Sequence, residues 1–115
     1  MKITARKTVI DSQEVISRIR KLQDFYHVLT KEEKGELKAL CALEKVACVA
    51  PGWRQGTPLV RDNYFGRFAQ DLAYSMYKGS EWPLYCVDWD RAAVNLQHNY
   101  TSLAFQGVEY WIRRR

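Results

Sequence analysis

The sequence predicts an α+β fold, with about four helices and a small antiparallel β-sheet that includes a C-terminal hairpin. Two observations support this prediction. Four segments place apolar residues three and four positions apart behind a capping residue, which is typical of amphipathic helices. Residues 102–112 instead alternate apolar and polar side chains on both sides of Gln106–Gly107, which is typical of a β-hairpin.

A first helix is predicted over residues 12–28. Asp11 can cap this helix, and Glu14 stands at the spacing of a capping box. The segment before the cap, residues 1–10, fits either a short strand or a loose basic arm. The apolar residues of the helix follow at intervals of three and four: Val15, Ile16, Ile19, Leu22, Tyr26 and Leu29.

A second helix is predicted to reach about Val49, behind a second capping box formed by Thr30 and Glu33. The short join between the two helices favours packing side by side. Pro51–Gly52 ends the second helix, and a loop is expected to run to about Arg61. Residues 1–50 thus form a basic helical part of the chain.

Residues 62–115 are predicted to form a helix–helix–hairpin module. Asp62 caps the third helix, Lys78–Gly79 ends it, and Asp88 caps the fourth. The apolar stripe of the third helix is Phe65, Phe68, Ala69, Leu72 and Met76, and the inward side of the fourth is Trp89, Ala92, Ala93 and Leu96.

The hairpin is expected to bury one side of each strand, with Trp111 out of phase. The segment from Trp82 to Val87 is expected to be extended. Residues 84–87 or the N-terminal segment are the candidates for a further strand. The expected buried set of the hairpin is Leu103, Phe105, Val108, Tyr110 and Ile112.

The 115 residues are expected to form one domain, because 47% of them are apolar and can supply a core. The net charge of +5 is unevenly distributed: residues 62–112 hold six acidic and three basic residues, so the rest carries +8. A surface of two signs suits a protein partner at least as well as DNA. No apolar run approaches the length of a membrane span, and no signal-peptide pattern opens the chain, so we expect no membrane contact.

The cysteines predict a reduced, cytoplasmic protein. Cys41, Cys48 and Cys86 are odd in number and show no C-x-x-C spacing. Cys41 and Cys48 are seven positions apart and are expected to be small core residues on one helix face. The two histidines are remote from the cysteines in the sequence, so we expect no metal site and no cofactor.

The sequence contains no zinc-protease motif, nucleophile elbow, P-loop or dinucleotide fingerprint. Its side chains therefore predict a protein that binds rather than catalyses. The candidate contact residues are an aromatic beside a guanidinium in the expected loop, two acids at a helix start and a basic tail. A tryptophan folded onto the core is the competing interpretation of the first. These candidates are Trp53, Arg54, Asp88, Asp90, Arg113, Arg114 and Arg115.

Stretches of the C-terminal half, Phe68–Ala73, Val87–Leu96, Asn99–Ser102 and Gly107–Arg113, resemble the C-terminal module of ArdA-type antirestriction proteins of phages and mobile elements. The resemblance covers less than half of the chain. It implies counter-defence by binding, because ArdA-type proteins are elongated, strongly acidic dimers that imitate DNA and occupy type I restriction enzymes. This chain departs from that pattern in its positive charge and its single predicted domain, which argues against whole-surface DNA mimicry.

The resemblance thus leads us to expect a non-enzymatic phage or mobile-element protein in the bacterial host cytoplasm. It would inhibit a restriction enzyme or, in the manner of an anti-CRISPR protein, a CRISPR–Cas effector by stoichiometric binding. The alternative is a small nucleic-acid-binding or regulatory module that uses the basic helices and the arginine tail. The oligomeric state stays open, a homodimer included.

Overall fold

The computed structural model describes residues 2–77, 82 and 84–114 and has the predicted α+β fold. A four-stranded antiparallel sheet has the strand order β1-β2-β4-β3. Its strands are β1 (Val9–Asp11), β2 (Pro58–Arg61), β3 (Tyr100–Phe105) and β4 (Val108–Arg113). The α-helices are α1 (Ser12–Asp24), α2 (Lys31–Ala47), α3 (Phe65–Tyr77) and α4 (Trp89–Gln97), and three 3₁₀ turns are η1 (Tyr26–Val28), η2 (Asp62–Tyr64) and η3 (Leu84–Cys86).

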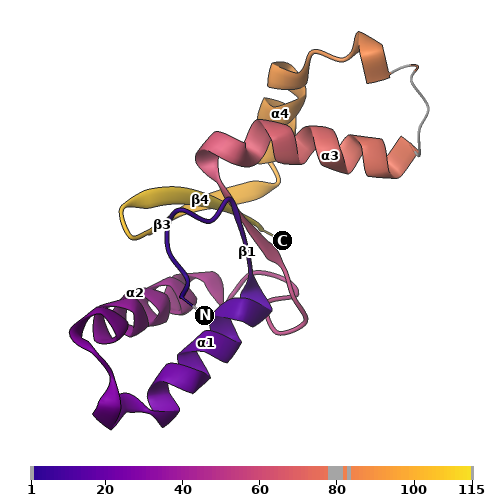
Figure 1. Cartoon of the computed structure of the whole chain (residues 1–115). Helices are drawn as coiled ribbons and strands as arrows, with labels where there is room; N and C mark the ends of the chain where they lie inside the picture. Colours follow the sequence, from indigo (N-terminus) through magenta and orange to yellow (C-terminus); the bar gives the residue numbers. More distant parts are fainter. Residues whose placement is uncertain (1, 78–81, 83, 115) are drawn as a thin grey trace.

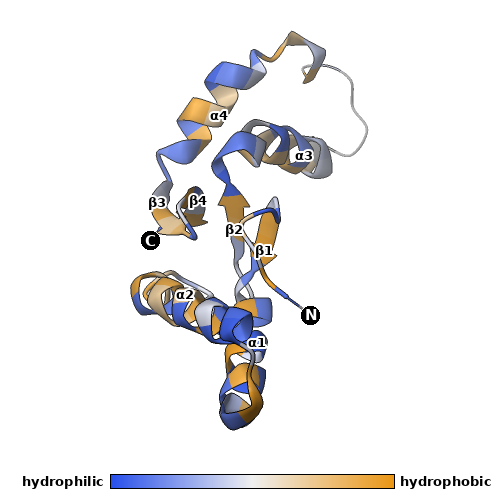
Figure 2. Ribbon diagram, turned by 60° about the vertical axis from the view of Figure 1, so that its left-hand side comes forward, coloured by the Kyte–Doolittle hydropathy of each residue, from blue (hydrophilic) through white to orange (hydrophobic). Residues whose placement is uncertain are grey.

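The sheet lies between two helix pairs, α1–α2 on one side and α3–α4 on the other (Figure 1). The molecule is therefore elongated, with extents of 56 × 25 × 24 Å. Figure 2 shows β1 and β2 largely in orange between the two helical layers. Adjacent strand residues point to opposite faces, so Leu59 enters a cluster with α1–α2 and Val60 enters one with α3–α4.

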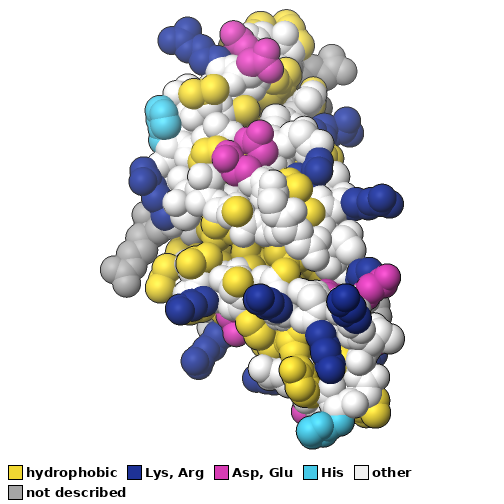
Figure 3. Space-filling model, turned by 90° about the vertical axis from the view of Figure 1, so that its left-hand side faces the viewer, with side chains coloured by type: hydrophobic (Ala, Val, Ile, Leu, Met, Phe, Trp, Pro, Cys, Tyr) yellow, Lys and Arg dark blue, Asp and Glu magenta, His cyan; other side chains and the backbone are white. Residues whose placement is uncertain are grey.

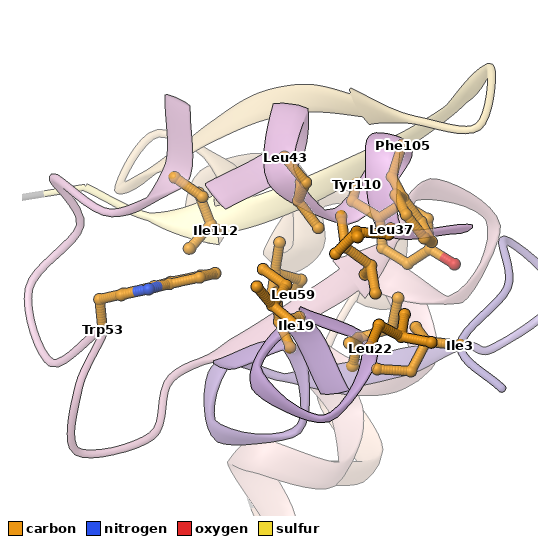
Figure 4. Close-up of a cluster of buried hydrophobic side chains, with 14 residues drawn as sticks. Ile3, Ile19, Leu22, Leu37, Leu43, Trp53, Leu59, Phe105, Tyr110 and Ile112 are labelled. Carbon is orange, nitrogen blue, oxygen red and sulfur yellow. The ribbon is translucent and has the colours of Figure 1, made fainter. Parts of the chain in front are cut away.

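The larger cluster packs α1 and α2 against one face of the sheet, and we call it the α1–α2 cluster (Figure 4). It includes most of the predicted inward residues of α1, α2 and the hairpin. Ile3 belongs to it as well, which anchors the N-terminal segment. Its buried members are Ile3, Ile10, Val15, Ile19, Leu22, Leu37, Leu40, Leu43, Ala47, Trp53, Leu59, Phe105, Tyr110 and Ile112.

A smaller α3–α4 cluster covers the other face and explains why Trp111 is out of phase in the sequence. Trp111 packs against Phe65 with the ring centroids 6.0 Å apart, and its Nε1–H donates to the carboxylate of Asp62 at 2.9 Å. Asp62 begins η2 and lies three residues before α3, so it does not hold the N-cap position of the third helix that the sequence predicted. The buried members of this cluster are Val60, Phe65, Ala69, Ala93 and Tyr100.

Four local predictions are confirmed, three helix caps and one hairpin turn. Asp11 and Glu14 form the capping box of α1, Thr30 and Glu33 form that of α2, and Asp88 accepts from the Arg91 N–H at the start of α4. The hairpin turns at Gln106 and Gly107, whose φ angles of 52° and 78° are those of a type I′ turn.

The predicted end of the first helix is wrong, and the second helix ends two residues before the expected position. α1 ends at Asp24 instead of residue 28, and Tyr26 lies in η1 with 49% of its surface exposed. α2 ends at Ala47, which leaves Cys48 exposed as its C-cap, contrary to the expected core position.

Two connecting segments also differ from the prediction. The last residues of the expected loop form β2, whose Leu59 and Val60 are fully buried on opposite faces. In the segment expected to be extended, Leu84–Cys86 forms η3 instead, at the end of the α3–α4 pair remote from the sheet (Figure 1). Of the alternatives at the N-terminus, the strand is confirmed over Val9–Asp11. The predicted helix end at Lys78–Gly79 lies outside the described residues.

Candidate functional site

The predicted contact residues do not form one site. Trp53 is 5% exposed and belongs to the α1–α2 cluster, where its ring points toward Ile112 (Figure 4), so the core interpretation is confirmed. Asp88 and Asp90 begin α4, on the other side of the sheet. Their carboxylates therefore cannot meet Trp53 and its neighbour around one ligand.

The basic tail lies at a third place, the end of β4. The side chains of Arg113 and Arg114 are exposed, and the Arg114 guanidinium donates to the backbone oxygen of His98. The third tail residue, Arg115, lies outside the described residues. Two of the three predicted arginines are thus exposed at the end of the inner strand β4.

A groove with a volume of about 950 Å³ runs between α1, α2 and the loop that follows α2. The loop is tied to α1 by Ser12, whose hydroxyl donates to the Trp53 oxygen and accepts from the Thr57 N–H, both at 2.7 Å. This tether places Arg54 on the rim. Arg20, Lys45 and Arg54 line the groove and form no ion pair with any residue that the structure describes, while Glu44 is its one acidic lining residue.

Cys41 also lines this groove, and its chemistry argues against a nucleophile. Burial raises the pKa of the Cys41 thiol, and the nearby Glu44 carboxylate raises it further. The thiol therefore stays protonated at neutral pH, whereas thiol catalysis needs the thiolate. The groove therefore has a mixed polar and apolar lining with three basic side chains and a protonated Cys41 thiol.

The outer surface of α2 carries a row of exposed lysines that the sequence only partly revealed. Lys31, Lys34, Lys38 and Lys45 recur at intervals of three, four and seven, so they share one side of the helix. We call these four residues the α2 lysine row. Figure 3 shows Lys and Arg side chains gathered over the lower part of this face, where α1 and α2 lie. In the sequence, glutamates between the lysines obscure this row. In the structure, the Glu33 carboxylate accepts from the Thr30 N–H and Glu36 is buried, so neither glutamate belongs to the exposed row.

The apolar stripe of α3 is covered at one end and uncovered at the other. Phe65 and Ala69 are 1% and 7% exposed, whereas Leu72 and Met76 are 36% and 69% exposed. Exposure therefore rises along the stripe, from the turns of α3 that pack on the sheet to its C-terminal half. We call Leu72 and Met76 the free α3 stripe.

Further apolar side chains are exposed on the same helix pair. Tyr74 stacks on Trp89 of α4 with the ring centroids 5.8 Å apart and is 44% exposed. Tyr85 and Val94 are 71% and 55% exposed. Exposed apolar groups also occur in the α1–α2 layer, where Phe25 and Val28 are 58% and 74% exposed, but those of the α3–α4 pair surround the free α3 stripe. Apolar groups gathered on a protein surface are typical of an interaction site.

Within the described residues, no group of three or more His, Cys, Asp or Glu side chains could hold a metal ion. None of the described helices is both long enough and apolar enough to span a bilayer. No family model, no curated protein and no solved structure matches this chain. The resemblance to ArdA-type proteins therefore stays a prediction.

Proposed function

We propose that this chain is a non-enzymatic counter-defence protein of a phage or mobile element, which acts in the bacterial host cytoplasm. It inhibits a defence complex, a restriction enzyme or a CRISPR–Cas effector, by stoichiometric binding. The observation that carries this proposal is the free α3 stripe, in which Leu72 is 36% and Met76 69% exposed. Exposed apolar side chains on one side of a helix support the proposal that the partner is a protein, because protein grooves bind such helices through residues at i and i+4.

The surroundings of the stripe support the same kind of partner. Methionine is flexible and adapts its shape to a binding surface, so Met76 suits an anchor position. Asp88 and Asp90 place carboxylates at the start of α4, on the helix whose Trp89 stacks on Tyr74. Acidic groups beside an apolar contact favour a partner with a basic rim, and defence complexes that hold nucleic acid present such surfaces.

The experiment is a phage-plaquing assay in bacterial strains that each carry one defence system, with and without this protein. We expect the wild-type chain to restore plaquing in one strain. Met76→Glu should abolish the rescue, because it places a charge in the proposed contact without disturbing a core position. Lys38→Glu, an exposed charge change on α2, is the matched control and should keep the rescue. Absence of rescue in every strain would contradict the proposal.

The α2 lysine row favours a second candidate, a small nucleic-acid-binding module. Its four cations on one side of a helix suit a phosphate backbone, and Arg113 and Arg114 add charge at the end of β4. A salt-titrated gel shift with duplex DNA and RNA tests this candidate. If it is correct, changing Lys34 and Lys38 to Ala lowers the salt dependence of binding by roughly two phosphate contacts. An unchanged slope would exclude the lysine row from nucleic-acid binding.

A further inference from the structure

Strand β3 is an outer strand of the sheet, and one of its edges has no partner among the described residues. It pairs with β4 alone, from Tyr100↔Arg113 to Phe105↔Val108. In a two-residue hairpin the pair next to the turn is hydrogen-bonded, and bonded and non-bonded pairs then alternate. The 3.0 Å hydrogen bond from the Arg114 N–H to the Asn99 oxygen continues this alternation beyond the strand.

The alternation determines which backbone groups point outward. Thr101, Leu103 and Phe105 bond to β4, so Tyr100, Ser102 and Ala104 direct their N–H and C=O groups away from it. Three consecutive sites for strand pairing therefore lie along the free edge.

Nothing in β3 protects this edge. Proteins usually block an exposed edge with charged side chains, a proline or a bulge. The β3 sequence, YTSLAF, contains no charge and no proline, and its register with β4 is continuous. The side chains of Thr101, Ser102 and Ala104 are exposed, so the edge is accessible.

A groove with a volume of about 630 Å³ lies at the start of β3, between the C-terminal end of α2 and the Thr101↔Ile112 pair. Thr101 lines it from β3, and Val46 and Val49, which are 57% and 78% exposed, line it from the C-terminal end of α2. Arg113 and Arg114 complete the lining with two cations. Figure 3 shows yellow side chains on this side of the molecule, between the Lys and Arg of α2 and the upper part of the structure.

We propose that the free edge of β3 binds an extended, acidic segment of a protein partner, which adds a fifth strand to the sheet. The outward groups of Tyr100, Ser102 and Ala104 supply the backbone hydrogen bonds. The groove accepts an apolar side chain of the segment, and Arg113 and Arg114 attract its carboxylates. A second copy of this chain fits less well, because it would bring the same cations together. The edge is a different surface from the free α3 stripe, so this proposal and the proposed function can fail independently.

The test uses the full chain and a fluorescein-labelled peptide in which valine and glutamate alternate, with a valine–lysine peptide of equal length as the control. Fluorescence anisotropy measures binding, and ¹⁵N NMR follows the backbone amides. We expect the acidic peptide to bind and to shift the amides of Tyr100, Ser102 and Ala104 more than those of Thr101 and Leu103. The lysine peptide should bind at least about tenfold more weakly.

Two variants examine the two parts of the site. Ser102→Pro removes one outward N–H without removing a hydrogen bond to β4, and it should weaken peptide binding about tenfold. Ser102→Ala is the matched control: it keeps that N–H and should change peptide binding less than about twofold. Arg113→Glu reverses an exposed charge and should also weaken peptide binding about tenfold. Because this variant leaves the strand backbone unchanged, it tests the site even if Ser102→Pro does not fold.

Four results would overturn the proposal. The first is failure of the acidic peptide to bind, and the second is equal binding of the two peptides. The third is a wild-type dimer that Ser102→Pro converts to a monomer, which would assign the edge to a second copy. The fourth is duplex DNA shifting the outward amides in place of the peptide, which would assign the edge to nucleic acid.

Discussion

At the scale of single residues, the least visible determinant of the fold in the sequence is Glu36. It lies among lysines and glutamates that read as a solvated helix surface, yet it is 2% exposed. Its carboxylate accepts from Arg18 Nε at 2.8 Å and from the Ile3 N–H at 3.0 Å. One side chain thus joins α1, α2 and the N-terminal segment, and only the packing of the helices reveals it.

Replacing Glu36 with Gln should therefore destabilise the protein by about 3–5 kcal/mol, because it leaves the guanidinium of Arg18 buried without a counter-charge. Urea unfolding monitored by circular dichroism measures this change. Glu32→Gln is the matched control: its partner Lys2 is exposed and 3.5 Å away, so the free energy of unfolding should change by less than about 1 kcal/mol. Equal effects of the two substitutions would contradict the structural role of Glu36.

The same carboxylate predicts a pH dependence. Burial raises the pKa of Glu36, but the hydrogen bonds from Arg18 and from the Ile3 N–H outweigh burial, so the pKa lies below its ordinary value. A lowered folded-state pKa stabilises the protein above the unfolded-state pKa of about 4.3, and this stabilisation is lost as the pH falls through the folded-state value.

The difference in unfolding free energy between the wild type and Glu36→Gln should accordingly be constant between pH 7 and about pH 5 and shrink in more acidic solution. A protonated glutamate resembles glutamine, which is why the two proteins converge. Chemical denaturation at a series of pH values measures the difference. A difference that stays constant into strong acid would show that the ionised carboxylate is not what stabilises the fold.

At the scale of elements, features built from neighbouring residues could be predicted and features built by packing could not. The three caps and the Gln106–Gly107 turn depend on residues within a few positions of one another. β2 is only four residues long, and its pairing with β1 and β4 brings together distant parts of the chain. Its Pro58–Leu59–Val60 run could have been interpreted as a short buried strand. The break between α1 and η1 has no comparable signal, because Tyr26 continues the helical spacing.

The two ends of the apolar stripe of α3 should differ in their effect on stability, which is separate from the proposed role of the exposed end in binding. Phe65→Ala should cost about 3–5 kcal/mol, because the ring is buried against the sheet, where it contacts the rings of Tyr100 and Trp111. Met76→Ala, on the same stripe, should change stability by less than about 0.5 kcal/mol. Thermal melts of the two variants measure both effects. A large loss for Met76→Ala would mean that the end of the stripe is covered in solution.

At the scale of the whole molecule, one sheet serves two cores. Leu59 and Val60 are neighbours in β2, yet they enter clusters on opposite faces, and β4 divides Tyr110 and Trp111 in the same way. The continuous sheet therefore joins the α1–α2 and α3–α4 layers, which is why the chain forms one elongated unit. The charge follows these layers, with the lysine row on one side and Asp88 and Asp90 on the other.

A shared sheet predicts that both layers unfold together. Val60→Ala removes buried volume only from the α3–α4 cluster and should cost about 1–3 kcal/mol. The substitution should nevertheless lower the melting temperatures of the α1–α2 cluster and of the α3–α4 cluster by the same amount. NMR melts can follow the indole N–H signals of Trp53 and Trp111 as reporters of the two clusters. The opposite result would be a lower melting temperature for the Trp111 signal while the Trp53 signal keeps its wild-type value. The two layers would then unfold independently. In that case a partner bound at α3–α4 could not stabilise the edge of β3 through the sheet.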